Sequence, residues 1–276
     1  MKKVFYLASG LFIFSITSIN AQALKNIGKK IEKTANQIGD KIDEVFDKEK
    51  SKNASDSSSK KKTKVGPFKN IPLLENDYKK GSEDLFTDDF SKDVKGSMAQ
   101  HWTSNGLGTV ETVDGFEGKW LRLYDANTYK IKDLYKIPED FTIEFDLLTL
   151  SETKHNFNVN FGFDYIKGVG QHYYLAQQNP INIQASYWFN KFEFNSKELE
   201  PEKSSTIDAN MSYFVNDIMK VKISIVGERM RTYINEYKIL DTEMVDPDTR
   251  KYFYIAINND KNTSSIYLSN FKLSKL

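Results

Sequence analysis

The chain has 276 residues, and its 39 Lys and Arg against 38 Asp and Glu give a formal net charge of +1 at pH 7. So close a balance creates no long-range field that would attract nucleic acid, and we expect no nucleic-acid partner. The absence of cysteine excludes a cysteine-linked lipid anchor, a cysteine nucleophile and thiolate metal sites. The 19 Phe and 15 Tyr, against 6 Pro, favour β-sheet.

Residues 1–23 have the pattern of a cleaved signal peptide. Lys2 and Lys3 supply a positive start, residues 4–19 are mostly apolar, and residues 21–23 offer a small-x-small cleavage site, with cleavage after Ala21 equally compatible. The rival interpretation is an uncleaved membrane anchor, which needs about 20 apolar residues. This stretch is interrupted at Ser9, Gly10, Ser15, Thr17 and Ser18. We predict export from a bacterial cytoplasm to the periplasm or cell surface, with no transmembrane span after cleavage.

Residues 24–49 are predicted to form an amphipathic helix. Apolar residues recur in steps of three and four, at Leu24, Ile27, Ile31, Ala35, Ile38, Ile42 and Val45 or Phe46. Lysines are concentrated near its beginning and carboxylates near its end. This order is unfavourable for the helix macrodipole, so we expect the helix to need a partner for stability. A second copy bound through residues 24–46, a membrane surface and the following domain are the alternatives, beside a loosely ordered spacer. The Lys- and Ser-rich residues 50–65 are predicted to be a disordered linker.

Residues 66–276 are predicted to fold as one all-β domain. Apolar and polar residues alternate with a period of two at 141–147, 156–165, 182–189, 219–225 and 252–257, and further strands close the chain. Turn signals separate these stretches, and no helical pattern alternates with them. Such a series of strands predicts a sandwich of two antiparallel sheets, with one buried and one polar face on most strands.

Five stretches of this domain resemble the concanavalin A-like lectin and glucanase domains, which include the LamG-like jelly rolls of bacterial envelope proteins. The stretches are Leu85–Ser91, Asp114–Leu123, Ile137–Asp146, Thr232–Leu240 and Ser265–Leu273. In the fourth, Glu236 replaces the usual Gly of the family's hairpin, so we expect a turn other than type I′. The resemblance implies a jelly roll with one concave polar sheet, on which relatives bind or hydrolyse sugars.

Little in the sequence supports an enzyme. The glucanase branch of the resembled family carries Glu-x-Asp-x-x-Glu on one strand, which brings two carboxylates into one cleft. Glu144 and Asp146 are present here, but Thr149 stands in the third position. The three histidines form no zinc-binding pattern, and no Gly-x-Ser-x-Gly motif occurs. A glycoside hydrolase with a different carboxylate pair stays open as an alternative.

A sugar-binding surface is the favoured prediction. Amide and carboxylate groups form hydrogen bonds with sugar hydroxyls, and aromatic rings stack on the apolar face of a sugar. The candidate ligand-binding residues, expected together on the polar faces of neighbouring strands, are Glu144, Asp146, Asn158, Asn160, Gln184, Trp188 and Tyr174. Asn is usually depleted in strands, so its repetition at 156, 158 and 160 is unexpected in an ordinary solvated sheet.

Calcium is the one cofactor that the resemblance implies. Many relatives hold one Ca²⁺ near their first and last strands, and Asp88 and Asp89 match that position. The predicted function is a non-catalytic module of an exported protein that binds carbohydrate or another envelope component. Besides the hydrolase, the alternative is a structural or protein-interaction protein that oligomerises through its N-terminal helix.

Overall fold

The structure is a computed structural model, which describes residues 66–69, 71, 77–132, 137–152, 157–169, 179–259 and 264–276. The predicted signal peptide, amphipathic helix and linker, residues 1–65, lie outside the described residues. Within the described ranges, no helix is long and apolar enough to cross a membrane.

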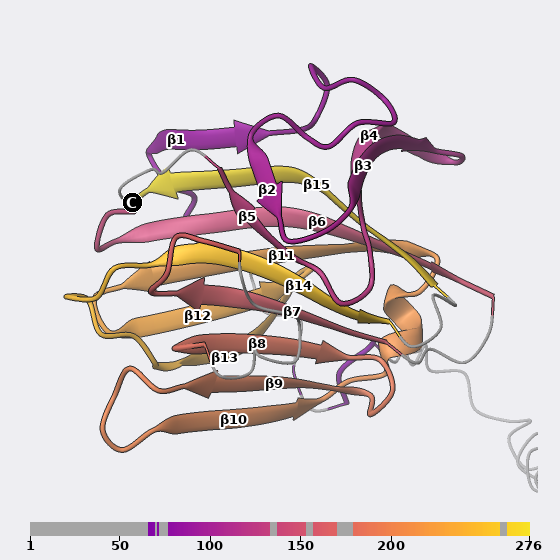
Figure 1. Ribbon diagram of the computed structural model, residues 1–276. Helices are drawn as coiled ribbons and strands as arrows, with labels where there is room; N and C mark the ends of the chain where they lie inside the picture. Colours follow the sequence, from indigo (N-terminus) through magenta and orange to yellow (C-terminus); the bar gives the residue numbers. More distant parts are fainter. Residues whose placement is uncertain are drawn as a thin grey trace, which may run out of the picture. The chain divides into compact units, whose positions relative to one another are not determined.

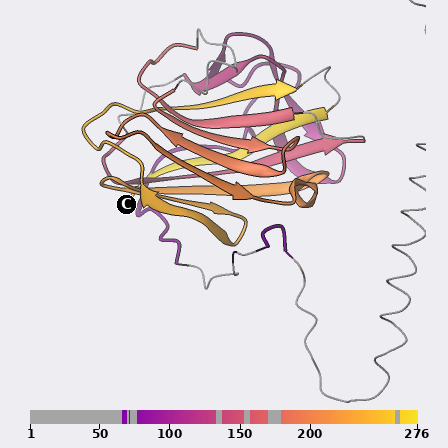
Figure 2. The ribbon, with the colours of Figure 1, turned by 90° about the horizontal axis from the view of Figure 1, so that it is seen from below.

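Two antiparallel sheets make up the fold (Figure 1, Figure 2). The eight-stranded sheet has the order β13-β12-β11-β6-β15-β4-β3, with β1 paired to β15. Its strands are β1 (Glu83–Asp88), β3 (Gly108–Val113), β4 (Phe116–Leu123), β6 (Phe141–Ser151), β11 (Asp217–Val226), β12 (Arg229–Ile234), β13 (Tyr237–Glu243) and β15 (Ser264–Lys275).

The second sheet has seven strands in the order β10-β9-β8-β7-β14-β5-β2. They are β2 (Trp102–Ser104), β5 (Thr128–Ile131), β7 (Phe157–Asp164), β8 (Ile181–Ser186), β9 (Lys191–Ser196), β10 (Lys203–Asp208) and β14 (Tyr252–Asn259). A short 3-10 helix, η1 (Met211–Phe214), lies between β10 and β11. The predicted all-β sandwich of two antiparallel sheets is confirmed.

Aromatic side chains from both sheets form the core. The ring of Phe145 on β6 lies 5.3 Å from that of Phe161 on β7 and 5.6 Å from that of Phe253 on β14, measured between centroids. Phe271 on β15 adds a ring 4.9 Å from Phe253. All four are buried, and burying a phenylalanine stabilises a fold by roughly 1.5–3 kcal/mol. The period-two pattern therefore places these residues between the sheets.

One predicted strand ends earlier than its alternation suggests. The pattern runs to Phe189, but β8 ends at Ser186 and residues 187–190 form the turn to β9. Asn190 takes a left-handed φ of 54°, which asparagine tolerates better than most residues. Tyr187 still faces the core, whereas Trp188 and Phe189 are 54% and 61% exposed.

The chain before β1 closes one edge of the sandwich. Phe68 is buried, and its ring centroid lies 6.1 Å from that of Phe192 on β9 and 5.2 Å from that of Tyr237 on β13. Because β9 and β13 belong to different sheets, Phe68 packs between the two sheets. The Pro67 carbonyl holds this segment in place by accepting a 2.8 Å hydrogen bond from the Asn210 amide.

Candidate functional site

The outer face of the seven-stranded sheet gathers polar side chains from its central strands. On β7, Phe161 faces the core, so Asn158 and Asn160 point to the opposite face. On β8, Gln184 stands opposite Asn160 and shares that face. The structure thus brings together three of the predicted ligand-binding residues: Asn158, Asn160 and Gln184.

Asn182 and Tyr254 complete this polar face. Both stand opposite Gly162 of β7, Asn182 on β8 and Tyr254 on β14. The Tyr254 hydroxyl donates a 2.7 Å hydrogen bond across the glycine to Asn182 Oδ1. Burial raises the pKa of Tyr254, so its hydroxyl stays a protonated donor. Asn182 is missing from the predicted set, although its period-two spacing from Gln184 is a signal that could have included it.

Three amide atoms among the described residues of this face are buried and have no hydrogen-bond partner. They are Asn158 Oδ1, Asn160 Oδ1 and Asn182 Nδ2. An unsatisfied buried polar group costs on the order of 1–3 kcal/mol. Such groups therefore point to a place where water or a ligand supplies the missing hydrogen bonds.

A buried ion pair lies on the same face. Lys130 on β5 stands opposite Tyr254, and its Nζ is 2.5 Å from Asp164 Oδ2 at the end of β7. The same amine donates to the Ile166 carbonyl at 2.5 Å. Burial lowers the pKa of Lys130, and the hydrogen bond to Asp164 acts in the opposite direction. The two charges offset each other, so this end of the face presents no net charge.

An open groove of about 590 Å³ runs over β8, β9 and β10 on this face. The side chains that line it include Gln184, Glu193, Asn195, Lys197, Glu202 and Lys203. Gln184 Nε2 donates to Glu193 Oε2 at 3.0 Å, and Lys191 Nζ lies 2.8 Å from Glu193 Oε1. Amides, hydroxyls and charges of both signs therefore converge in a groove that adjoins the buried amides.

Trp188 is not on a strand of this polar face. Trp188 lies in the turn between β8 and β9 instead of on a strand. Its indole ring faces solvent beside Phe189, with the two ring centroids 6.4 Å apart. Tyr174 lies outside the described residues.

Glu144 and Asp146 lie on the other sheet, which corrects the expectation that they share a polar face with Asn158 and Gln184. They belong to β6, whose core side carries Phe145. Their side chains therefore point to the outer face of the eight-stranded sheet. Asp146 Oδ2 accepts a 2.8 Å hydrogen bond from Asn270 Nδ2 there. The error arises because β6 and β7 are consecutive in sequence but join different sheets.

Thr149, which stands where the glucanase pattern has its third carboxylate, has a structural role. Thr149 is buried, and its hydroxyl donates a 2.7 Å hydrogen bond to the Phe214 carbonyl at the end of η1. It faces the core, whereas Glu144 and Asp146 face outward on the same strand.

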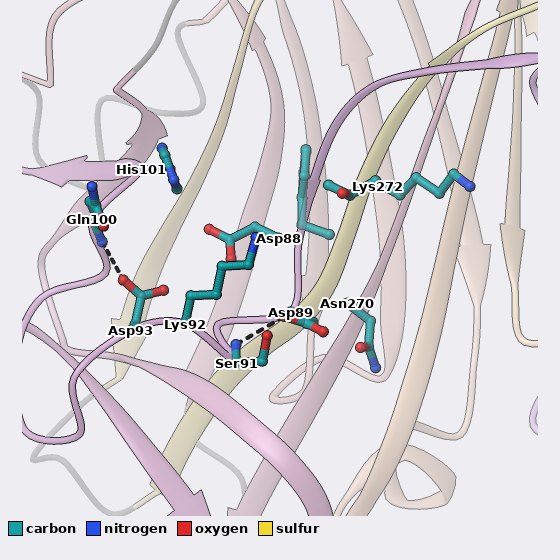
Figure 3. A pocket seen from close by; sticks show the side chains of 11 residues that line it. Asp88, Asp89, Ser91, Lys92, Asp93, Gln100, His101, Asn270 and Lys272 are labelled. Carbon is teal, nitrogen blue, oxygen red and sulfur yellow. Dashed lines mark hydrogen bonds between the residues drawn. The ribbon is translucent and has the colours of Figure 1, made fainter.

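Asp88 and Asp89 line a separate pocket of about 430 Å³, at the end of β1 (Figure 3). The buried Asp88 carboxylate accepts hydrogen bonds from the Phe90 amide at 2.9 Å and from Trp102 Nε1 at 3.0 Å. Burial raises the pKa of Asp88 above its usual value. Asp89 Oδ1 accepts a 2.9 Å bond from the Ser91 amide.

This pocket does not fit the calcium site that the resemblance implies. The carboxylates of Asp88, Asp89 and Asp93 do not converge on one point in Figure 3. Within the described ranges, no three His, Asp or Glu side chains are grouped so that they could hold a metal ion. Calcium usually takes six to eight oxygen ligands, so we assign no metal to these residues.

Solved structures show which fold this is. The carbohydrate recognition domain of Emp47p matches with a TM-score of 0.50 and 10% identity, over 72% of this chain and 99% of that one. The binding domain of botulinum neurotoxin DC, in complex with SialylT, matches with a TM-score of 0.46 and 14% identity, over 70% of this chain and 48% of that one. The chain therefore spans about half the length of the neurotoxin domain. The exoplasmic/lumenal domain of VIP36, in its Ca²⁺-bound form, matches with a TM-score of 0.48 and 13% identity, over 68% of this chain and 88% of that one.

At such low identity, the match to the Emp47p domain shows the fold alone. The fold is the concanavalin A-like jelly roll that the sequence resembles, and the two antiparallel sheets agree with it. No protein-family model and no curated protein matches the chain.

Proposed function

We propose that this domain is a non-catalytic carbohydrate-binding module of an exported protein, with its ligand in the open groove over β8, β9 and β10. One observation carries the proposal: an open polar groove adjoins buried amides that have no protein partner. Sugar hydroxyls donate and accept hydrogen bonds, so they suit the amide groups of Gln184 and Asn195, which line the groove. The Emp47p carbohydrate recognition domain, which has the same fold, agrees with this role.

The contacts of Glu193 favour binding over hydrolysis. One of its oxygens pairs with Lys191 and the other accepts a hydrogen bond from Gln184. A retaining or inverting hydrolase needs one carboxyl group as a proton donor and a second as nucleophile or base. Glu193 is instead held as an acceptor, which suits a group that orients sugar hydroxyls.

The test is a glycan-array and polysaccharide pull-down screen of the full chain, in which released reducing sugar is also measured. The test variants are Asn160→Ala and Asn195→Ala. The control is Asp146→Asn, which changes a polar side chain on the outer face of the other sheet. We expect binding without sugar release, weakened about tenfold or more in the test variants and unchanged in the control.

Each other outcome selects an alternative. Release of reducing sugar would favour the glycoside hydrolase. Failure to bind any glycan would reject the proposal and favour the protein-interaction alternative. Equal weakening of binding by Asp146→Asn would contradict a site on the seven-stranded sheet.

The screen is run with added calcium and with a chelator. Because the Asp88 and Asp89 pocket lacks a convergent set of ligands, we expect the chelator to leave binding unchanged. Loss of binding in chelator, restored by calcium, would contradict this and make Asp89→Asn the next variant to test.

Export and self-association are part of the same proposal. N-terminal sequencing of protein recovered outside the cytoplasm should begin at Gln22 or Leu24 if the leader is cleaved at either predicted position. Light scattering should give a larger assembly for the mature chain than for a chain without residues 24–46. Equal oligomeric states would reject self-association through that segment.

A further inference from the structure

The open groove and the exposed turn after β8 are joined by an unbroken series of contacts. Trp188 packs against Phe189, and Lys191 Nζ lies 5.3 Å from the centre of the Phe189 ring. The same amine pairs with Glu193 at 2.8 Å, and Glu193 accepts a hydrogen bond from Gln184 at 3.0 Å. We call these five side chains the hairpin row.

The strand register explains why the hairpin row is continuous. In the pairing of β8 with β9, Gln184 stands opposite Glu193, and Asn182 stands opposite Asn195. Residues opposite each other in an antiparallel pair share one face, as do residues two apart on one strand. Lys191 and Asn195 are four residues apart on β9, or about 13 Å at roughly 3.3 Å per residue, and Phe189 lies beyond Lys191 in the turn. The hairpin row and groove together are therefore longer than one sugar ring.

The chemistry of the hairpin row changes along its length. The groove end offers amide groups together with two lysines and two glutamates, whose formal charges cancel, whereas the turn offers the exposed rings of Trp188 and Phe189. Large exposed aromatic side chains grouped beside a polar rim are typical of interaction sites. Between the two ends, the charges of Lys191 and Glu193 offset each other. The ligand that complements such a surface is uncharged, with hydroxyls at one end and an apolar ring face at the other.

We infer that the groove and the hairpin row form one extended site for an uncharged oligosaccharide of several sugar units. One end of the sugar chain forms hydrogen bonds in the groove, and a later unit stacks on Trp188 or Phe189. This inference rests on the proposed function, because it requires that the groove bind sugar.

The experiment is titration calorimetry of the full chain with oligosaccharides of increasing length. The probes are β-1,4-linked glucose and N-acetylglucosamine series from the monosaccharide to the hexasaccharide, and the same series for any other neutral glycan found on the array. Oligogalacturonate is the charged counterpart. The test variant is Trp188→Ala/Phe189→Ala, and Asn195→Ala changes the groove end. Leu107→Ala, in the loop after β2, is the matched control because Leu107 is also an exposed apolar side chain.

We expect affinity to rise with chain length and then reach a plateau. The Trp188→Ala/Phe189→Ala variant should bind the hexasaccharide about tenfold more weakly while its affinity for the shortest bound sugar stays unchanged. Asn195→Ala should weaken binding at every length, and Leu107→Ala should change nothing. Because Trp188 and Phe189 are exposed, these substitutions should leave the thermal unfolding midpoint nearly unchanged.

The contrary outcomes separate this inference from the function on which it rests. Affinity that does not depend on length, or a hexasaccharide affinity unchanged in the double variant, would overturn the extended site and leave the groove proposal standing. Preferential binding of oligogalacturonate that weakens with added salt would overturn the uncharged ligand. Failure to bind every sugar on the array and in the series would reject the proposed function, and this inference with it.

Discussion

At the residue scale, Gly162 determines how the polar face of the seven-stranded sheet is built. Its φ is 154°, a conformation that other residues rarely adopt. A Cβ at this position would lie 2.1 Å from the Ile181 carbonyl oxygen on the neighbouring strand. Glycine therefore lets β7 and β8 pair closely beneath the Tyr254–Asn182 hydrogen bond.

Gly162→Ala should lower the free energy of unfolding by about 3 kcal/mol, because it adds both a steric clash and backbone strain. Urea denaturation measures this loss. Gly168→Ala is the control, since a Cβ there would meet no atom within 4 Å, and it should change stability by less than about 0.5 kcal/mol. Equal effects of the two substitutions would contradict the steric explanation.

The Lys130–Asp164 pair gives a second prediction at this scale. Both side chains are buried, so Lys130→Met leaves the Asp164 carboxylate without its cation. We expect the single variant to lose about 3–5 kcal/mol of stability and Lys130→Met/Asp164→Asn to lose less, because the double variant removes both buried charges. Chemical denaturation of the wild type, Lys130→Met, Asp164→Asn and the double variant measures the coupling. A double variant less stable than Lys130→Met would contradict the explanation that an unpaired Asp164 carboxylate causes the loss of stability.

At the element scale, the strands were predictable but their assignment to sheets was not. The period of two identified β6 and β7 from local sequence, because each strand alternates between an apolar core side and a polar outer side. Their partners, however, are distant: β6 pairs with β11 and β15, and β7 pairs with β8 and β14. Nothing local specifies those pairings, so Glu144 and Asn158 could be predicted to be polar and outward but not to lie on opposite faces of the sandwich.

The groove was predicted only in part for a related reason. Asn158 and Asn160, beside the groove, stand out because Asn is uncommon in strands, and Gln184, which lines the groove, was predicted from its polar position on a strand. Glu193 and Asn195 join them only through the pairing of β8 with β9. The exposed rings of Trp188 and Phe189 depend on a turn that the alternation alone places inside a strand. Sequence periodicity therefore does not determine which distant strands pair or where a turn interrupts the alternation.

The segment that closes the sandwich edge gives a prediction for a single element. Phe68→Ala should lower the free energy of unfolding by about 3–5 kcal/mol, because it opens a cavity between β9 and β13. Lys69→Ala, at the exposed neighbour, is the control and should have little effect. Denaturant titration of both variants measures the two losses. A small loss of unfolding free energy for Phe68→Ala would show that the Phe68 contacts are dispensable.

At the scale of the whole molecule, one apolar core joins the two sheets. Phe145 of the eight-stranded sheet contacts both Phe161 and Phe253 of the seven-stranded sheet. Neither sheet can bury its apolar face without the other, so the sheets should unfold together. The polar groove lies on an outer face and takes no part in this core.

Phe145→Ala and Phe161→Ala test this cooperativity from opposite sheets. Each should cost about 3–5 kcal/mol, and tryptophan fluorescence and far-ultraviolet circular dichroism should report the same transition in both variants. Their combined effect should differ from the sum, since the two rings are in contact. Separate transitions for the two probes would show that the sheets unfold independently.

The position of Phe68 also has a mechanical consequence. A pulling force applied along the chain from its N-terminal side reaches the Phe68 contacts and the Pro67–Asn210 hydrogen bond before it reaches the ladder of β1 with β15. Those few contacts would break one after another, whereas the paired strands resist load through many hydrogen bonds at once. In an optical-tweezers experiment, extension should therefore begin with a small release at low force, and the sandwich should open in a later, larger step.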